Sequence, residues 1–231
     1  MIDFHGFGDQ LLLGAWMTLK LAFGALGVGI VLGLAGAVAK LSDVWAARAV
    51  AEAYTTVVRG LPELLVVLII YFGSSAMLTT IAGWMGHDEF IELSPYAAGV
   101  TALGLTFGAY ATEVFRGAIQ AIPKGQIEAA RAFGMSRTLT FRRIVLPQVW
   151  RIALPGLGNL FLVLLKDTSL ISVIGLEELM RKASIAVGFT REPFTFYLTA
   201  AVLYLLMTIV TMVALHFAER AAARGVPKMA S

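Results

Sequence analysis

The sequence predicts an all-α integral membrane protein with five transmembrane helices, and three observations lead to this fold class. The chain of 231 residues is 58% hydrophobic and only 14% charged, whereas a soluble domain carries roughly 25% charged residues. Its mean hydropathy is positive. Its apolar residues are gathered into long runs, and a helix that crosses a bilayer core needs about 20 mainly apolar residues. A soluble globular core does not explain such runs.

Five apolar runs are long enough to cross a bilayer. They lie at residues 11–39, 56–82, 95–122, 145–165 and 196–217. Pro62 stands near the start of the second run, and Pro95 suits the first turn of the third, because its missing N–H would have no helical partner there. The first ten residues contain acids but no basic stretch, so we expect no cleavable signal peptide and a first run that is retained as a span. No internal repeat is evident, and residues 1–231 are expected to form one membrane domain.

Basic residues are unevenly distributed among the connecting segments, which predicts the orientation. Lys and Arg gather in the first loop, the third loop and the C-terminal tail, whereas the second loop has Asp88, Glu89 and Glu92 and no basic residue. Because Lys and Arg are enriched in cytoplasmic loops, five spans place the N-terminus outside and the C-terminus in the cytoplasm. The third loop, residues 124–147, is therefore expected on the cytoplasmic side.

Glycines are spaced four residues apart in the first and third spans, at Gly29 and Gly33 and again at Gly104 and Gly108. This small-xxx-small pattern lets helix backbones approach each other closely. The contact that it predicts lies either within one chain or between two subunits.

The third loop is expected to form two short helices bent at Gly134. From Gly125 to about Leu139 nothing else breaks a helix strongly, and Ser136 is suited to cap a second helix. Glu128 and Arg131, three residues apart, lie on the same side of the first helix. The simpler interpretation is an ordinary cytosolic loop with the usual excess of basic residues.

The order of residues in this loop favours a more specific role. It matches the pattern EAA-x(3)-G-x(9)-I-x-L-P, which is the signature of ABC importer permeases. Every fixed position is present, namely Glu128, Ala129, Ala130, Gly134, Ile144, Leu146 and Pro147. In that family the segment forms the coupling helices, which dock on a cytosolic ATPase subunit. The resemblance implies the same role here.

Other stretches resemble permeases of the polar amino acid uptake family. These are YTTVVRGLPELLVVLIIYFG, GAYATEVFRGAIQAIPKGQIEAA and LPGLGNLFLVLLKDTSLISVIGLEEL, which together cover nearly the whole chain. The chain is most similar to the Q-type subunits of importers for histidine, lysine, arginine and ornithine and for octopine and nopaline. One departure is Asp167, where some basic amino acid permeases have serine, and it leaves the exact substrate open.

The resemblance implies a type I ABC importer permease with a MetI-like fold, placed in the bacterial inner membrane with a periplasmic N-terminus. It also implies a second permease subunit, usually non-identical, two ATPase subunits and a periplasmic solute-binding protein. The implied substrate is a polar amino acid, chiefly a basic one, or an opine. No phosphate-binding loop of the form G-x(4)-G-K-[ST] occurs in the sequence. ATP and Mg²⁺ are therefore expected on partner subunits, and this chain is expected to be no enzyme and to bind no cofactor or nucleic acid.

Charged residues in or beside the spans are the remaining candidates, because ionisable groups there are costly and usually have a role. Glu113 and Arg116 stand three residues apart and can pair with each other. Alternatively, the Glu113 carboxylate lies at the substrate pathway and attracts a cationic substrate. For Lys20 we expect snorkelling toward the membrane surface. Structural roles are expected for Arg59 with Pro62 and Glu63 at the cytoplasmic entrance of the second span, and for Lys166 with Asp167 after the fourth.

A short amphipathic helix is expected at the outer surface, as a contact for the binding protein or as a solvated face. Its charged residues are Glu177, Glu178, Arg181 and Lys182. The three histidines, His5, His87 and His216, are far apart and lack metal-ligand spacing, so no metal site is expected. The chain has no cysteine, which excludes disulfides and thiolate chemistry.

Two other functions are alternatives to ATP-driven import. An ion-coupled secondary amino acid transporter needs no ATPase, but such folds usually contain inverted repeats and paired broken helices, and the sequence indicates neither. A scaffolding membrane protein without a pathway would have no reason to carry the EAA spacing. The sequence therefore favours the permease of an ATP-driven importer.

Overall fold

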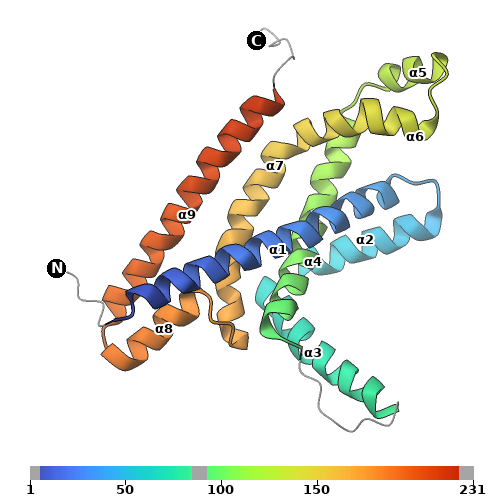
Figure 1. The fold of residues 1–231 in the computed structure, drawn as a ribbon. Helices are drawn as coiled ribbons and strands as arrows, with labels where there is room; N and C mark the ends of the chain where they lie inside the picture. Colours follow the sequence, from blue (N-terminus) through green and yellow to red (C-terminus); the bar gives the residue numbers. More distant parts are fainter. Residues whose placement is uncertain (1–5, 85–92, 224–231) are drawn as a thin grey trace.

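The structure is a computed structural model that describes residues 6–84 and 93–223, and every element within these ranges is a helix (Figure 1). The all-α prediction is confirmed. In chain order the elements are α1 (Gly8–Lys40), α2 (Trp45–Gly60), α3 (Glu63–Trp84), α4 (Pro95–Gln120), α5 (Lys124–Ala132), α6 (Arg137–Thr140), the π-helix η1 (Phe141–Val145), α7 (Leu146–Asp167), the 3₁₀-helix η2 (Thr168–Ile174), α8 (Leu179–Thr190) and α9 (Pro193–Ala222).

Four stretches of the described chain are long and apolar enough to cross a membrane. They are α1, α3, the continuous stretch Arg137–Ile174 and α9. The remaining predicted span, α4, is rich in Ala, Gly and Thr, and 13 of its 26 residues are buried. It packs against α1, α2, α3 and α7, and small residues are typical of helices enclosed by other helices in a membrane. The fifth crossing therefore stays a prediction. Pro95 does stand in the first turn of α4, as predicted, and the Ser94 hydroxyl caps that helix.

The prediction of one continuous helix over residues 56–82 is wrong. The helix is interrupted at Leu61 and Pro62, between α2 and α3. A residue before proline is held away from the helical conformation, and Leu61 is extended, with φ −100° and ψ 143°. α2 instead packs against α1 and α4, and the Tyr54 hydroxyl donates a 2.7 Å hydrogen bond to the Leu105 carbonyl. The apolar run is thus split between an amphipathic helix and a separate, mainly apolar one.

The most extensive helix contact lies between α1 and α4, where the two glycine pairs face each other. A Cβ added to Gly33 would lie 2.7 Å from the Cβ of Ala111. Added Cβ atoms on Gly29, Gly104 and Gly108 would also lie under 3.0 Å from the opposite helix. The small-residue patterns therefore serve packing within one chain at this contact.

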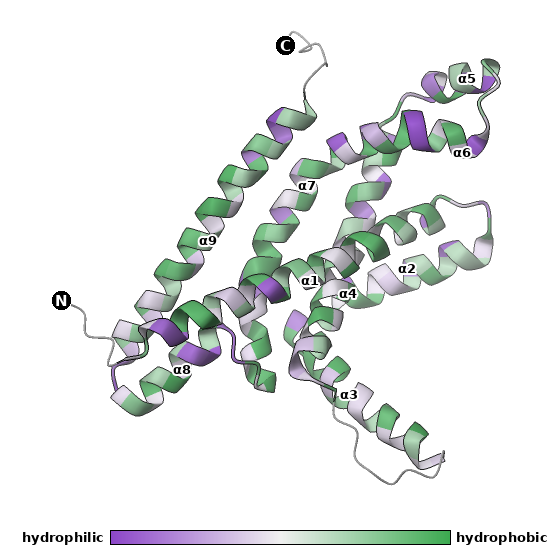
Figure 2. Ribbon diagram, viewed as in Figure 1, coloured by the Kyte–Doolittle hydropathy of each residue, from purple (hydrophilic) through white to green (hydrophobic). Residues whose placement is uncertain are grey.

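Hydrophobic side chains form a main core around α1, α4 and α7 and a smaller one where α8 packs against α1 and α9. The buried residues of α9 are Phe196 and Ala200, both near its beginning, and most of its apolar length faces outward. Strongly hydrophilic residues gather mainly on α5 and α6 at one end of the molecule and on α8 at the other (Figure 2). This distribution fits a chain that lies across a bilayer.

Candidate functional site

The loop with the EAA spacing projects from one end of the molecule as α5 and α6, joined by a sharp turn (Figure 1). Gly134 makes this turn with φ +79°, a left-handed conformation that costs glycine little. Its N–H donates to the Arg131 carbonyl at 2.9 Å, and the Met135 N–H donates to the Ala130 carbonyl at 3.0 Å. This is the Schellman pattern that ends a helix. The predicted bend at Gly134 is confirmed.

Beyond the turn, the Ser136 hydroxyl accepts a 3.3 Å hydrogen bond from the Leu139 N–H and caps α6, as predicted. On the other side, Gln148 of α7 donates a 2.7 Å hydrogen bond to the side-chain carbonyl of Gln126, which holds α5 against α7. The two short helices are therefore anchored to the start of α7.

The residues of the EAA pattern divide into an inner and an outer group. The buried or half-buried members are Ala130, Ile144 and Leu146, and the exposed members are Glu128, Ala129, Gly134 and Pro147. Phe133, which sequence reasoning missed, is 89% exposed beside the turn. Exposed aromatic rings are enriched where proteins bind each other. The outer group with this ring offers a surface for a partner protein.

A pocket of about 270 Å³ opens between the start of α3, α4 and the end of α7. Glu63 and Asp167 both line it, together with Thr106 and Tyr110 of α4. Within the described part of the chain, neither carboxylate forms a hydrogen bond or an ion pair within 4.0 Å. Two like charges that share a site disfavour each other's ionisation, and an opposite charge nearby favours it. The pocket is therefore suited to a cationic group.

The break between α2 and α3 places Glu63 beside the middle of α4. Because α2 intervenes, α3 begins beside residues 103–110 of α4, well inside that helix rather than at either end. Glu63 is thus the first residue of α3 rather than a residue within one helix over 56–82. Its expected place at the cytoplasmic entrance of a span and the structural role expected for Asp167 stay predictions. Helices broken near the bilayer midplane often form transport sites. Pro62 was the signal in the sequence that could have indicated such a break.

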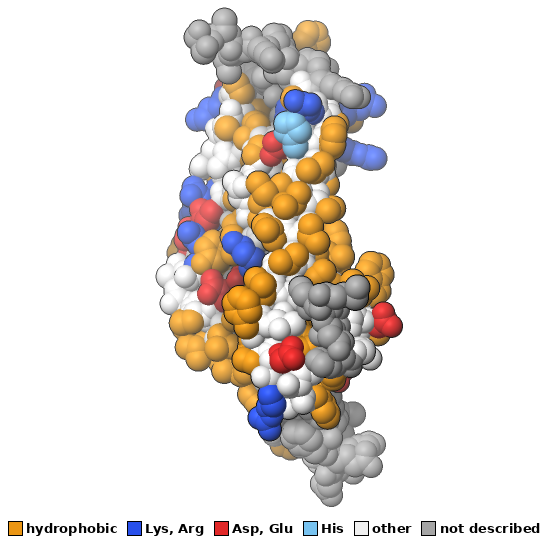
Figure 3. Space-filling model, turned by 90° about the vertical axis from the view of Figure 1, so that its left-hand side faces the viewer, with side chains coloured by type: hydrophobic (Ala, Val, Ile, Leu, Met, Phe, Trp, Pro, Cys, Tyr) orange, Lys and Arg blue, Asp and Glu red, His pale blue; other side chains and the backbone are white. Residues whose placement is uncertain are grey.

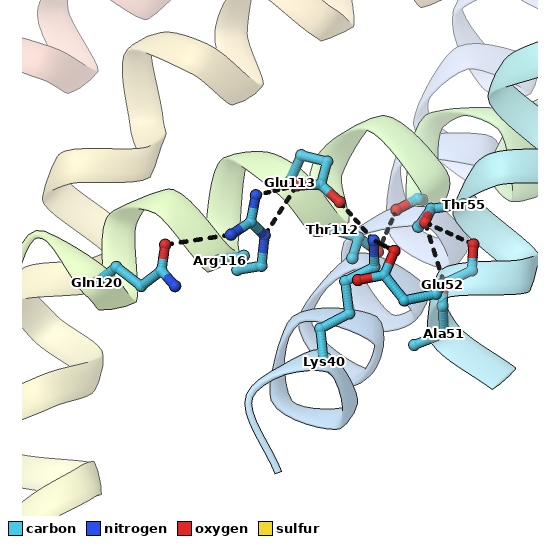
Figure 4. A network of polar contacts seen from close by, with 9 residues as sticks. Lys40, Ala51, Glu52, Thr55, Thr112, Glu113, Arg116 and Gln120 are labelled. Carbon is cyan, nitrogen blue, oxygen red and sulfur yellow. Dashed lines mark hydrogen bonds and ion pairs between the residues drawn. The ribbon is translucent and has the colours of Figure 1, made fainter. Parts of the chain in front are cut away.

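A second polar cluster joins α1, α2 and α4 (Figure 4). Lys40 has a side chain that is only 5% exposed, and its Nζ lies 2.7 Å from Glu113 Oε1 and 2.9 Å from Glu52 Oε2. The other Glu113 oxygen accepts hydrogen bonds from Arg116 Nε and Nη2 at 2.8 and 2.6 Å. The local pair of Glu113 and Arg116 is confirmed, and Lys40 is an additional partner that sequence reasoning missed. Both Glu113 oxygens are engaged, whereas the carboxylates of the pocket are free.

Both polar clusters lie along one face of α4. Thr106 and Tyr110 line the carboxylate pocket, and Tyr110 and Glu113 line a neighbouring polar cavity of about 580 Å³. The guanidinium of Arg59 lies 5.2 Å from the centre of the Tyr110 ring, a cation–π contact in this second cavity. This face of α4 therefore carries a polar track from the middle of the helix toward its α5 end.

Glu178 is buried at the opposite end of the molecule, so it is no part of a solvated face. The predicted amphipathic helix exists as α8, and the Glu178 carboxylate caps it by accepting from the N–H groups of Met180 and Arg181 at 2.9 and 2.8 Å. The Tyr204 hydroxyl of α9 donates to the same carboxylate at 3.0 Å. Burial raises the pKa of the Glu178 carboxyl group. Glu178 therefore ties α8 to α9.

Three of the other predicted charged residues, Lys20, Lys166 and Glu177, are exposed, and Lys182 is half-buried. Glu177 pairs with Lys182 at 2.6 Å beside α8. Within residues 6–84 and 93–223 no group of three His, Cys, Asp or Glu side chains could hold a metal ion. His5, His87 and the acidic residues of the second loop lie outside the described residues.

Comparison with known proteins identifies the family to which this chain belongs. Residues 27–224 match the family described as binding-protein-dependent transport system inner membrane component. The octopine transport system permease protein OccQ of Agrobacterium tumefaciens (strain Ach5) is 48% identical over 223 residues, which cover 96% of this chain and 94% of OccQ. The histidine/lysine/arginine/ornithine transport system permease protein HisQ of Escherichia coli (strain K12) is 43% identical over 224 residues, 97% of this chain and 98% of HisQ.

Among solved structures, the crystal structure of an amino acid ABC transporter with histidines matches with a TM-score of 0.79 and 35% identity, covering 96% of this chain and 99% of that one. The resemblance inferred from the EAA spacing is thus confirmed. The chain belongs to the family of binding-protein-dependent transport system inner membrane components, which are transport subunits and not enzymes.

Proposed function

We propose that this protein is the permease subunit of an ATP-driven importer that carries cationic amino acids, or opines built on them, across the bacterial inner membrane. The observation that carries the proposal is the pair of free carboxylates, Glu63 and Asp167, in one pocket against the middle of α4. A guanidinium or ammonium group between them would relieve their repulsion, and each hydrogen bond to a charged group contributes about 1.5–3 kcal/mol. A pocket of about 270 Å³ is near the lower end of small-ligand sites, which begin at about 300 Å³.

The printed names of the relatives support this substrate class. OccQ is a permease for octopine, and HisQ is one for histidine, lysine, arginine and ornithine. These four amino acids share a basic side chain, which is the group that a pair of carboxylates would recognise.

The end formed by α5 and α6 is proposed to dock on a separate ATPase subunit through Glu128, Ala129, Gly134 and the exposed Phe133. From there α6, η1, α7 and η2 form one continuous stretch, Arg137–Ile174. Asp167 stands near the far end of this stretch, whereas the other carboxylate of the pocket belongs to α3. A displacement of α6 by the ATPase would therefore move one carboxylate relative to the other. This geometry supports alternating access in which the cation site opens and closes with ATP hydrolysis.

The proposed assembly contains a second, non-identical permease, two ATPase subunits that bind ATP and Mg²⁺, and a periplasmic solute-binding protein. α4 is proposed as a fifth membrane crossing, with the N-terminus periplasmic and the C-terminus cytoplasmic. The arginines on α5, α6 and η1 support this orientation, because cytoplasmic loops are enriched in Lys and Arg.

Reconstitution of the importer in liposomes with its ATPase, second permease and binding protein tests the proposal. Uptake of arginine is compared for the wild type, Glu63→Gln, Asp167→Asn and the control Asp43→Asn, whose carboxylate is exposed between α1 and α2. We expect each pocket variant to lower arginine uptake about tenfold or more, and the control to leave it unchanged. For Glu113→Gln, the pathway hypothesis predicts a larger loss for arginine than for neutral citrulline. An equal loss for both would indicate that Glu113 acts only through its ion pairs.

Two results would refute the proposal. Uptake driven by a sodium or proton gradient without ATP would indicate an ion-coupled secondary transporter. Undiminished arginine uptake in both Glu63→Gln and Asp167→Asn would show that the pocket is not part of the substrate pathway. If that uptake still required ATP, the chain would remain the permease of an ATP-driven importer.

A further inference from the structure

An apolar groove of about 590 Å³ runs between α1 and α9, with α7 as its floor. Phe23, Phe161 and Val210 are among its walls, one from each helix. The lining residue with a hydroxyl group is Thr211, whose Oγ1 donates a 2.8 Å hydrogen bond to the Met207 carbonyl. Hydrophobic side chains extend along the face that includes α9 (Figure 3). The groove is therefore fitted to hydrocarbon.

One end of the groove continues into a second cavity of about 650 Å³, and Ile30 and Trp150 line both. Arg151 lines this second cavity. Its Nε is buried and has no hydrogen-bond partner among the described residues. A buried charged donor without an acceptor is costly. An occupant that brings a negatively charged oxygen to this end would satisfy it.

The groove is as long as one leaflet of a bilayer. Along α9 its lining extends from Leu206 to Ala218, which is about 18 Å at a rise of 1.5 Å per residue. Half of a hydrocarbon core is about 15 Å thick, whereas a transmembrane helix of a partner protein needs about 20 residues and the full 30 Å. The groove thus has the length of an acyl chain and is too short for a helix that crosses the membrane.

The charge at the Arg151 end agrees with this occupant. Arg142 and Arg143 of η1 precede Arg151 by about two helical turns, and Arg220 lies in the last turn of α9, beside Ala221 of the same cavity. A phosphate group would meet a positive environment there. Apolar walls of one-leaflet length that end at an arginine with a buried Nε fit the arrangement of a phospholipid, with its chain in the hydrocarbon and its phosphate at the interface.

We propose that a phospholipid occupies this groove, with an acyl chain between α1 and α9 and its phosphate oxygens accepting hydrogen bonds from Arg151. The acyl chain lies over α7, beside the place where Leu215 of α9 packs close to Gly158. The lipid therefore adds to the contact that α7 and α9 already make.

Native mass spectrometry of the assembled importer, released from phospholipid vesicles by mild detergent, tests this site. The phospholipid retained per permease is counted for the wild type, Arg151→Gln, Ala214→Trp and Arg48→Gln. Ala214 lines the middle of the groove, and Arg48 is an exposed arginine of α2 that serves as the matched control. We expect Arg151→Gln and Ala214→Trp to lower lipid retention about tenfold or more and the control to match the wild type. Arg151→Lys keeps the charge and should retain most of the lipid.

Several outcomes would overturn the proposal. Undiminished lipid retention in Arg151→Gln would show that the arginine holds no phosphate. Retention of inorganic phosphate at Arg151 that is equal in the wild type and Ala214→Trp, with no bound lipid in either, would indicate an anion site only. Cross-linking of a photoreactive group at position 214 to the second permease, in an importer free of retained lipid, would assign the groove to a protein partner. Size-exclusion chromatography of each variant with its ATPase checks that it assembles.

Discussion

Gly33 of α1 lies against Ala111 of α4, and its replacement by leucine probes how closely the two central helices pack. A Cβ at this position would lie 2.7 Å from the Ala111 Cβ, 3.2 Å from the Ala111 carbonyl carbon and 3.3 Å from the Thr112 nitrogen. These neighbours are backbone atoms and a methyl group that cannot rotate away. Gly33→Leu is therefore expected to force the helices apart.

The size of the effect follows from a comparison with Gly27, where an added Cβ meets no atom within 4 Å. In both variants leucine replaces glycine inside α1, and this gains up to about 1 kcal/mol in helix propensity. Only Gly33→Leu also incurs overpacking, which costs about 1–3 kcal/mol. For chains of this length 1 kcal/mol shifts the melting temperature by about 2–4 °C. We expect Gly33→Leu to melt roughly 2–12 °C below Gly27→Leu.

Thermal denaturation of the purified complex, followed by fluorescence-detected size-exclusion chromatography, measures this difference. Both variants are compared in the same detergent, so that the shared effects of leucine cancel. Equal melting temperatures for the two variants, or a lower one for Gly27→Leu, would refute the close packing inferred at the α1–α4 contact.

The remaining predictions concern the two ends of the molecule. Gly134→Val places a β-branched residue at φ +79°, which costs at least about 1–2 kcal/mol although an added Cβ there meets no neighbour. We expect the ATPase to dissociate or to hydrolyse ATP without uptake, whereas the control Gly125→Ala, within regular helix, should keep both activities; full uptake by Gly134→Val would contradict the docking role. The pKa of Glu178 is raised above 4.5 by burial, so the folded protein holds this proton more tightly than the unfolded chain. Stability is then greatest below the unfolded pKa and falls as pH rises toward the folded one. Melting temperatures from roughly pH 4 to 7 should depend less on pH in Glu178→Gln, and a steeper decline in that variant would contradict this reasoning.

The apolar segments and the turn at Gly134 could be predicted because their signals are local. Hydropathy places α1, α3 and α9, and the glycine between two short helical stretches places the end of α5. The second predicted span failed at Pro62, because the apolar run continues through the break and outweighs the single proline that signals it, whereas the extended backbone of Leu61 shows it directly. Hydropathy also leaves α4 uncertain, since a helix enclosed by other helices can be built from small residues.

The sequence by itself determined the family and the position of the EAA segment, because both depend on the order and spacing of residues along the chain. The tertiary structure decided which ionisable groups are paired and which are free. Lys40 engages Glu113 from 73 residues away, whereas Glu63 and Asp167 come from different helices and meet in one pocket, and neither forms an ion pair within 4.0 Å among the described residues. Such pairings depend on how helices distant in sequence pack together, and no local pattern of residues specifies that.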